Sequence, residues 1–398
     1  MKRLFNSFYD GYIHTSIPNI NKISIKYISS PQLLVHKNSF LNEDSFISNE
    51  IKNEIKKCNY CYEIKLNPSQ SITSFYPYKS NKYMPVITIY YLMKNKKQPS
   101  IKSISPQLRR ICFISNLYSK HNSDSTPLKC WICPTSTKKR LPSIQTKNSI
   151  STQISTPTPS SIILGPNNVN SGLSIPDIGH IKIWREEELN KVITHELIHI
   201  YKLDKALYET SEINNYIRTK LNISSSSDIN VNEAYTEGLT TLLNTIFIMI
   251  DDKINNNINT QSQYKKYKSI LNTELDFSLN QTAKILHYYG YKNINELFIN
   301  RINNINNNTQ WKQNSNVLSY YIIKTALLYN LDDFIKFLQK TNRFKVEKQN
   351  ISDFKILLDK SINNRDFIKQ VNTYMKKYKK HNTNEKKQNS SLRMTVFG

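Results

Sequence analysis

The sequence predicts an α+β protein, with a sheet-bearing N-terminal half packed on a central helix and a mostly helical C-terminal half. Up to about residue 134, apolar runs with the alternation of strands are mixed with runs that have the period of helices, whereas residues 251–375 repeat helical spacing alone. A chain of 398 residues is long enough to form two or three subdomains with a sizeable core.

The N-terminal region, residues 1–134, combines both kinds of element. Residues 22–28 and 86–92 are rich in β-branched and aromatic side chains, which favours strands. Residues 43–57 and 106–119 carry apolar side chains at helical spacing. We therefore expect this region to be α/β.

Composition distinguishes the remaining segments. Residues 135–161 are rich in Ser, Thr, Pro and Lys, which is typical of an exposed loop, and residues 162–250 hold the motifs described below. Residues 251–375 are expected to form a helical subdomain on the far wall of a cleft. The tail, residues 376–398, begins with a Lys-rich and Asn-rich run that is expected to be solvated and disordered, although residues 392–397 turn apolar again.

The chain is strongly basic, with a formal net charge of +25 and an isoelectric point near 9.6. Such a charge fits a nucleic-acid partner, an acidic substrate or a membrane surface. The chain is also loaded with Lys, Asn, Ile and Tyr and has only seven Gly, which is the bias expected from AT-rich coding. We find no Arg/Gly-rich arm, basic heptad helix or RNA-binding signature, so a nucleic-acid partner stays open but is supported by no motif.

No segment predicts export or a membrane span. The first five residues are followed by polar and aromatic residues instead of the apolar run of a signal peptide. The longest apolar stretch, residues 239–250, is interrupted by Thr and Asn and is too short to cross a bilayer. We expect a soluble intracellular protein without a membrane partner.

Four of the five cysteines form two C-x-x-C pairs, Cys58/Cys61 and Cys130/Cys133. Tetrathiolate zinc sites use such pairs, but with a far shorter gap between them. Both pairs also lie in strand-like apolar surroundings. Buried free thiols in a reducing compartment are therefore favoured over a structural zinc site.

The most informative motif is the H-E-x-x-H pentad that contains His195, Glu196 and His199. On an α-helix, positions i and i+4 share one face, so both imidazoles can reach one metal ion while the Glu faces a water on it. Acidic residues at 186–188 and the apolar spacing that follows predict a helix from about 185 to 205. An amphipathic core helix with two satisfied histidines would show the same pattern.

The segment before the pentad predicts a strand beside this helix. Three of the seven Gly fall at positions 165–179, and residues 180–184 alternate in the manner of a strand. In proteases, an edge strand next to the metal helix pairs with an extended substrate, so Asn170, Ser171 and Gly172 are candidate substrate-binding residues. An ordinary hairpin would have the same sequence pattern.

A catalytic zinc site needs a third protein ligand, and the sequence offers two carboxylates for it. Glu233 lies 34 residues after His199, and Glu237 follows one helical turn later on a predicted helix that runs to about residue 250. One helix face therefore presents two carboxylates. They are suited to one metal ligand and one acceptor that fixes the tautomer of a ligand histidine.

Together these residues resemble the gluzincin metallopeptidases, the superfamily of thermolysin, over roughly residues 165–250. The pattern Asn-Glu-Ala-x-x-Glu at 232–237 is similar to that of thermolysin, which implies that Glu233 binds zinc and Glu237 supports the first histidine. The pattern Glu-Gly-Leu-Thr at 237–240 resembles the gluzincin aminopeptidases instead, which implies that Glu237 is the ligand. Both assignments stay open at this point.

Neighbouring residues refine the resemblance. No Gly-x-x-His follows His199, so the continuation of a metzincin motif is missing. Gly238 is expected to mark a close approach by the helix at 185–205. The stretch from Val169 to the pentad is also similar to uncharacterised metalloprotease-like proteins of large cytoplasmic DNA viruses.

The resemblance implies peptide hydrolysis by zinc-activated water. Glu196 would take a proton from the water as general base and hand it to the leaving amine. The oxyanion needs a donor besides the metal, in these enzymes commonly a Tyr or His of the helical subdomain. Tyr320, Tyr321 and His287 are the candidates, although in a chain with 25 Tyr packing explains each of them as well.

We therefore expect one catalytic Zn²⁺ and a polypeptide substrate that is cleaved internally. Two other functions stay open. One is a basic structural or nucleic-acid-associated virion protein with a vestigial metal site, which would show salt-dependent DNA binding and no peptidase activity. The other is a zinc hydrolase of non-peptide substrates, because the pentad specifies activated water and not the bond attacked.

Overall fold

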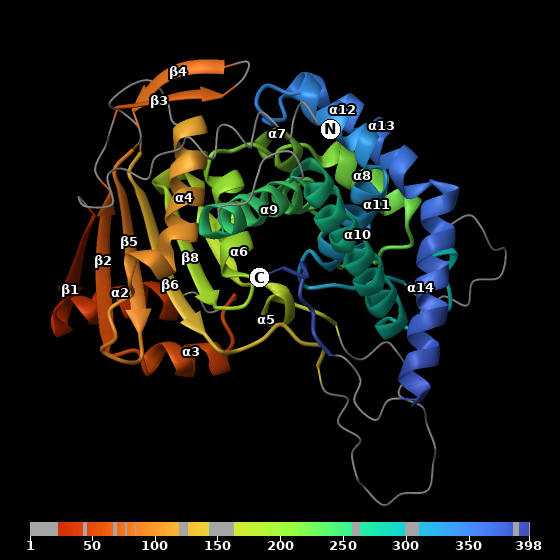
Figure 1. Cartoon of the computed structure of the whole chain (residues 1–398). Helices are drawn as coiled ribbons and strands as arrows, with labels where there is room; N and C mark the ends of the chain where they lie inside the picture. Colours follow the sequence, from red (N-terminus) through yellow and green to blue (C-terminus); the bar gives the residue numbers. More distant parts are fainter. Residues whose placement is uncertain are drawn as a thin grey trace, which may run out of the picture.

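The protein has the expected α+β architecture. A six-stranded sheet occupies one side of the molecule and a helical half the other, with α6 (Leu189–Ile200) and α9 (Asn232–Asn256) between them (Figure 1). The computed structural model describes residues 23–42, 46–66, 70–75, 78–83, 85–118, 126–142, 163–256, 263–298, 310–384 and 390–397.

The main sheet has the strand order β1-β2-β5-β6-β8-β7. Its centre is parallel, because β6 pairs in parallel with both β5 and β8, whereas β1, β2 and β7 run antiparallel to their neighbours. The strands predicted at 22–28, 86–92 and 180–184 are β1, β5 and β8. The bounds are β1 (Ser24–Ile28), β2 (Tyr60–Leu66), β5 (Ile87–Met93), β6 (Leu128–Thr135), β7 (Gly172–Ile175) and β8 (His180–Arg185), and a separate hairpin is formed by β3 (Gln70–Phe75) and β4 (Tyr78–Tyr83).

Helices cover both faces of this sheet. Cys130 and Ile132 on β6 point into the larger core, which also contains α4 (Ile101–Tyr118) and α6, whereas Trp131 and Cys133 point into a second core. That second core is formed with α2 (Ser30–Leu41) and α3 (Asn49–Lys56). The alternation along β6 is what a strand buried on both faces requires.

The C-terminal half is helical over the residues described there. Residues 143–162 of the expected Ser/Thr/Pro-rich loop and residues 299–309 of the helical subdomain lie outside the described residues. The shorter elements before α9 are α5 (Pro166–Val169), η3 (Pro176–Ile178), α7 (Lys205–Tyr208) and α8 (Ser211–Lys220). The later ones are α10 (Gln263–Tyr288), η5 (Ile294–Leu297), the π-helical η6 (Leu318–Ile323), α11 (Lys324–Tyr329), α12 (Leu331–Lys340), η7 (Lys348–Asn350), α13 (Ile351–Ile362) and α14 (Arg365–Asn384). None of the helices in these ranges is long and apolar enough to cross a membrane.

Both ends of the helix that carries the H-E-x-x-H motif differ from the predicted range of about 185 to 205, because α6 spans Leu189–Ile200. Arg185 belongs to β8, and its buried guanidinium donates to the backbone carbonyls of Thr137, Asn167 and Asn170. The acidic run at 186–188 is not a first helical turn, because Glu188 is the N-cap of α6 and has a left-handed backbone with φ 63°. Such a conformation costs free energy in a non-glycine residue and persists only where other contacts hold it.

The prediction of a disordered tail is wrong for residues 376–384, because they continue α14. The reason is tertiary packing. Met375 and Tyr378 on α14 are buried, and this helix lies along α10. Residues 385–389 lie outside the described residues.

Residues 390–397, here called the C-terminal segment, pack inside the molecule. The amide of Leu392 donates to the carbonyl of Lys139 at 3.0 Å. The amides of Met394 and Thr395 both donate to Oε1 of the buried Glu188 at 2.7 Å, while its Oε2 pairs with Lys139 Nζ, also at 2.7 Å. The C-terminal segment therefore supports the residue that begins α6.

Candidate metal centre

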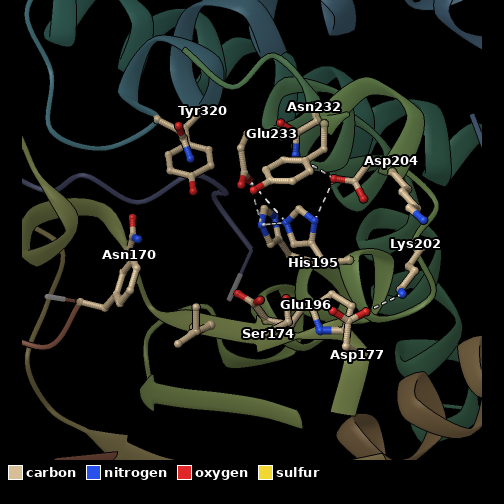
Figure 2. Close-up of a pocket in the computed structure, with 18 of the residues that line it drawn as sticks. Asn170, Ser174, Asp177, His195, Glu196, Lys202, Asp204, Asn232, Glu233 and Tyr320 are labelled. Carbon is tan, nitrogen blue, oxygen red and sulfur yellow. Dashed lines mark hydrogen bonds and ion pairs between the residues drawn. The ribbon is translucent and has the colours of Figure 1, made fainter. Parts of the chain in front are cut away.

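Helix α6 presents both histidines of the H-E-x-x-H motif on one face. The Nε2 atoms of His195 and His199, one turn apart, lie 3.1 Å from each other. Val192, Ile193 and Leu197 on the same helix are buried in the larger core and fix its orientation. The two imidazoles therefore face one point at the wall of a cleft, where Figure 2 shows His195 beside Glu233.

The two carboxylates of α9 have different partners. Glu233 Oε2 lies 3.3 Å from His195 Nε2 and 3.5 Å from His199 Nε2. Glu237 Oε1 lies behind the first imidazole, 2.9 Å from His195 Nδ1, and its other oxygen pairs with the buried ammonium of Lys191. Among the described residues, His195, His199 and Glu233 are the single group of three or more His, Cys, Asp or Glu side chains close enough to share an ion.

Asp204 supports the second imidazole, and the sequence analysis missed it. Its Oδ2 lies 2.8 Å from His199 Nδ1 and also accepts from Asn232 Nδ2 at 2.9 Å and Thr236 Oγ1 at 3.2 Å. The only sequence signal was an acidic residue five positions after His199. Since both Nδ1 atoms face carboxylates, both Nε2 atoms are left to present lone pairs to a metal.

The three atoms fit a tetrahedral zinc site. Zinc bonds of about 2.0–2.2 Å to N and O place neighbouring ligands of a tetrahedron about 3.3–3.6 Å apart. Two of the separations here, 3.3 and 3.5 Å, lie in that range, and the third, 3.1 Å between the two Nε2 atoms, is shorter by about 0.2 Å. Glu233 Oε2 is buried and makes no hydrogen bond of good geometry, so a cation would satisfy an otherwise unmatched buried oxygen.

The surroundings of the imidazoles favour positive charge. Burial on its own would lower the pKa of His195, but Glu233 and Glu237 raise it to about 9. Burial would also lower the pKa of His199, but Asp204 and Glu233 together raise it well above its usual value. For Glu233, burial would raise the pKa, and the two imidazoles hold it well below its usual range. A cation would find the same favourable field.

Glu196 lies beside the imidazoles and under β7. It is only 5% exposed, and burial raises its pKa, while a hydrogen bond with Ser174 works in the opposite direction. The strand passes so close that a Cβ on Gly172 would lie 2.6 Å from Glu196 Oε1 and 2.9 Å from Val192 Cγ1. Gly172 therefore permits the approach of the strand to the carboxylate. A carboxyl group with a raised pKa is suited to proton transfer near neutral pH.

A cleft of about 580 Å³ runs past these groups, with β7 along one side. Strand β7 forms a hairpin with β8 and is also an edge of the sheet, so substrate binding along it stays a prediction. Asn170 and Gly172 line the cleft, whereas Ser171 is buried and lines a cavity of about 30 Å³ behind it. The other lining residues include Leu173, Ser174, Pro176, Asp177, Lys202, Lys205, Tyr208, Glu209, Asn316 and Phe46.

Of the three predicted oxyanion donors, only Tyr320 lines the cleft. It belongs to the π-helical turn η6, its ring centroid lies 6.3 Å from that of His195, and burial raises its pKa so that its hydroxyl stays protonated. The prediction of Tyr321 as an oxyanion donor is wrong, because its hydroxyl donates to the carbonyl of Leu392 at 2.6 Å. The prediction of His287 is also wrong, because this residue does not line the cleft and its ring packs against Tyr378 on α14.

Gly238 is indeed a point of close approach, but the expected neighbour was wrong. A Cβ there would lie 3.0 Å from the ring of Phe334 on α12, and no atom of α6 is among its nearest neighbours. The glycine therefore serves the packing of α9 on α12 in the helical half.

Comparison with known proteins finds one viral similarity. The chain is 26% identical, over 351 residues, to a protein of Acanthamoeba polyphaga mimivirus described as uncharacterized protein R210. The match covers 87% of this chain and 80% of that protein. No family model matches the chain, and no solved structure does.

Proposed function

We propose that the chain is a zinc metallopeptidase of the gluzincin type, with His195, His199 and Glu233 as the metal ligands. The observation that carries the proposal is the convergence of two Nε2 atoms and one carboxylate oxygen at tetrahedral spacing. A ligand Glu on a downstream helix, with a second acid behind the first histidine, is what the resemblance to gluzincins implies. Glu237 takes that second position.

The remaining polar groups have distinct roles in this mechanism. A zinc ion in the site would polarise the scissile carbonyl and lower the pKa of a water molecule. Glu196 accepts the proton of the attacking water and delivers it to the leaving amine. Glu237 and Asp204 hold the imidazoles in the tautomer that presents Nε2. Tyr320 donates its hydroxyl hydrogen to the oxyanion.

The edge strand β7 favours a polypeptide substrate over a non-peptide one. A peptide laid along this strand would form main-chain hydrogen bonds with it, which is how extended peptides bind to sheet edges. The carboxylates on the rim are already paired, Asp177 with Lys202 at 2.7 Å and Glu209 with Lys205 at 3.2 Å. Neither carboxylate is therefore available to bind the N-terminal amine of a substrate, as an aminopeptidase requires. We propose that the chain acts as an endopeptidase.

The test compares the wild-type protein with Glu196→Gln. Metal analysis is expected to find about one zinc per chain in both, and the wild type is expected to cleave a fluorescent casein in a chelator-sensitive manner. The variant should keep its zinc and lose about 10²–10⁴-fold in activity, because it lacks the proton acceptor. Full activity in the variant, or in metal-free wild type, would contradict the mechanism.

A viral setting is the second part of the proposal. The similarity to the mimivirus protein supports it, and so does the Lys, Asn and Ile bias of the composition. The rival function, a basic structural or nucleic-acid-associated protein, requires DNA affinity that falls with salt and no cleavage of any peptide substrate.

A further inference from the structure

Cys58 and Cys133 come together although they belong to different C-x-x-C pairs. Cys58 follows the end of α3 and Cys133 lies near the end of β6, and their Sγ atoms are 3.5 Å apart across 75 positions of the chain. Both are buried in the smaller core, between the sheet and helices α2 and α3. A disulfide bond is about 2.05 Å long, so a relative movement of roughly 1.5 Å would join them.

The surroundings single out Cys58 among the five cysteines. The hydrogen bond with Cys133, together with the charges of Lys37 and Lys94, lowers the pKa of the Cys58 thiol. Burial raises the pKa of each of the other thiols outside this pair, to about 12. The thiolate is the attacking form of cysteine, so Cys58 is the one expected to react.

Cys58 is also close to the surface of the protein. It is flanked by Lys57 and Asn59, which are both exposed, at the end of the eight-residue helix α3. Opening the last turn of this short helix would bring the thiol into contact with a small solute, whereas Cys133 sits behind it on an interior strand.

We propose that Cys58 and Cys133 form a redox site that becomes a disulfide by exchange with a small-molecule disulfide such as oxidised glutathione. The Cys58 thiolate attacks one sulfur of the small disulfide, which forms a mixed disulfide and releases one thiolate. Cys133 then loses its proton and attacks Cys58 Sγ, which displaces the second thiolate. In total, two protein thiols are oxidised, one small disulfide is reduced to two thiols, and the protons pass to these products. The bond would join the α3–β2 junction to β6.

The experiment uses the full-length protein incubated with oxidised glutathione, then denatured and alkylated with N-ethylmaleimide for peptide mass mapping. The expected result is three alkylated cysteines and one linked pair of peptides containing Cys58 and Cys133, with free thiols regained after dithiothreitol. Cys133→Ser should stop at a glutathione adduct on Cys58, and Cys58→Ser should give neither adduct nor link. Cys112→Ser is the matched control, because it removes a buried thiol outside the pair and should leave the link intact.

Two results would overturn this inference. One is the wild-type protein with all five cysteines alkylated after oxidation, and the other is a link that includes Cys61 or Cys130. Both are read from the wild type, so neither depends on whether a variant folds. The inference does not rest on the proposed metal site.

Discussion

The substitution Gly172→Ala tests the placement of Glu196 against the edge strand. The added Cβ would lie 2.6 Å from Glu196 Oε1, whereas ordinary contact begins near 3.4 Å, so the carboxylate would have to move by roughly 0.8 Å. Val192 Cγ1, one turn earlier on the same helix, would lie 2.9 Å from the added Cβ, so the new methyl group would crowd α6 at two points. A displacement of about 1 Å at a catalytic group costs about 100-fold in rate, and we expect kcat/KM to fall by about that factor.

The assay is kcat/KM on a fluorescent casein, measured beside zinc content and thermal unfolding. None of the proposed metal ligands is among the three atoms nearest to the new methyl group, so zinc content should match that of the wild type. Gly165→Ala is the control, because its Cβ would meet nothing closer than Asn314 at 3.5 Å. The reasoning is refuted if Gly172→Ala keeps wild-type kcat/KM, or if Gly165→Ala loses as much.

Four further predictions concern five single substitutions, of which the first two are compared with each other. Glu233→Gln should weaken zinc affinity, measured by chelator competition, by more than about 100-fold, and Glu237→Gln by about 10-fold, because the first removes a ligand and the second only its support. Lys191→Met should weaken zinc affinity by about 10-fold, since it leaves the Glu237 carboxylate with one partner fewer. Tyr320→Phe should lower kcat by about 10²–10³-fold and leave zinc affinity unchanged. Glu54→Gln should lower the Tm at neutral pH. Burial would raise the pKa of Glu54, but an ion pair and hydrogen bonds outweigh it and hold this pKa at about 2, below the ordinary 4.5. The resulting stabilisation of the folded state is complete above pH 4.5 and disappears as the pH falls toward 2.

Each of these predictions has an outcome that would contradict it. A greater loss of zinc from the Glu237 variant than from the Glu233 variant would favour Glu237 as the ligand. Unchanged zinc affinity in the Lys191 variant would show that Glu237 holds its place without the ammonium. A Tyr320 variant with normal kcat would remove the phenol from the mechanism. Parallel curves of Tm against pH for the Glu54 variant and the wild type would show that this carboxylate is not perturbed.

The elements with strong periodicity could be predicted from the sequence, and their ends could not. The acidic residues before α6 looked like a first helical turn, but Glu188 is turned into the interior to meet Lys139 and the C-terminal segment. Those partners lie 49 and 206 positions away, so no local pattern reveals them. The same holds for α14, where packing on α10 extends a helix into a Lys-rich run that composition assigned to disorder.

For the candidate site, spacing was enough to find groups that share a helix. His195 and His199 lie one turn apart on α6, and so do the two acids on α9, but which acid faces the imidazoles depends on how the helices cross. Asp204 and Lys191 act through contacts between elements, and nothing in their spacing marks them as partners of a histidine and a carboxylate. Tyr320 and Tyr321 are adjacent in sequence and point about 100° apart on a helix, so which of them faces the cleft depends on how this helical turn is oriented in the fold.

The contact between Glu188 and the C-terminal segment has a consequence for folding. The amides that satisfy this carboxylate are supplied by Met394 and Thr395, more than 200 positions later, and closing so long a loop carries an entropy cost that precedes the contact. Helix α6 would therefore gain its last support only when nearly the whole described chain has assembled. A chain shortened before residue 390 would keep every residue of the H-E-x-x-H motif and still leave a buried carboxylate without its amide donors at the start of that helix.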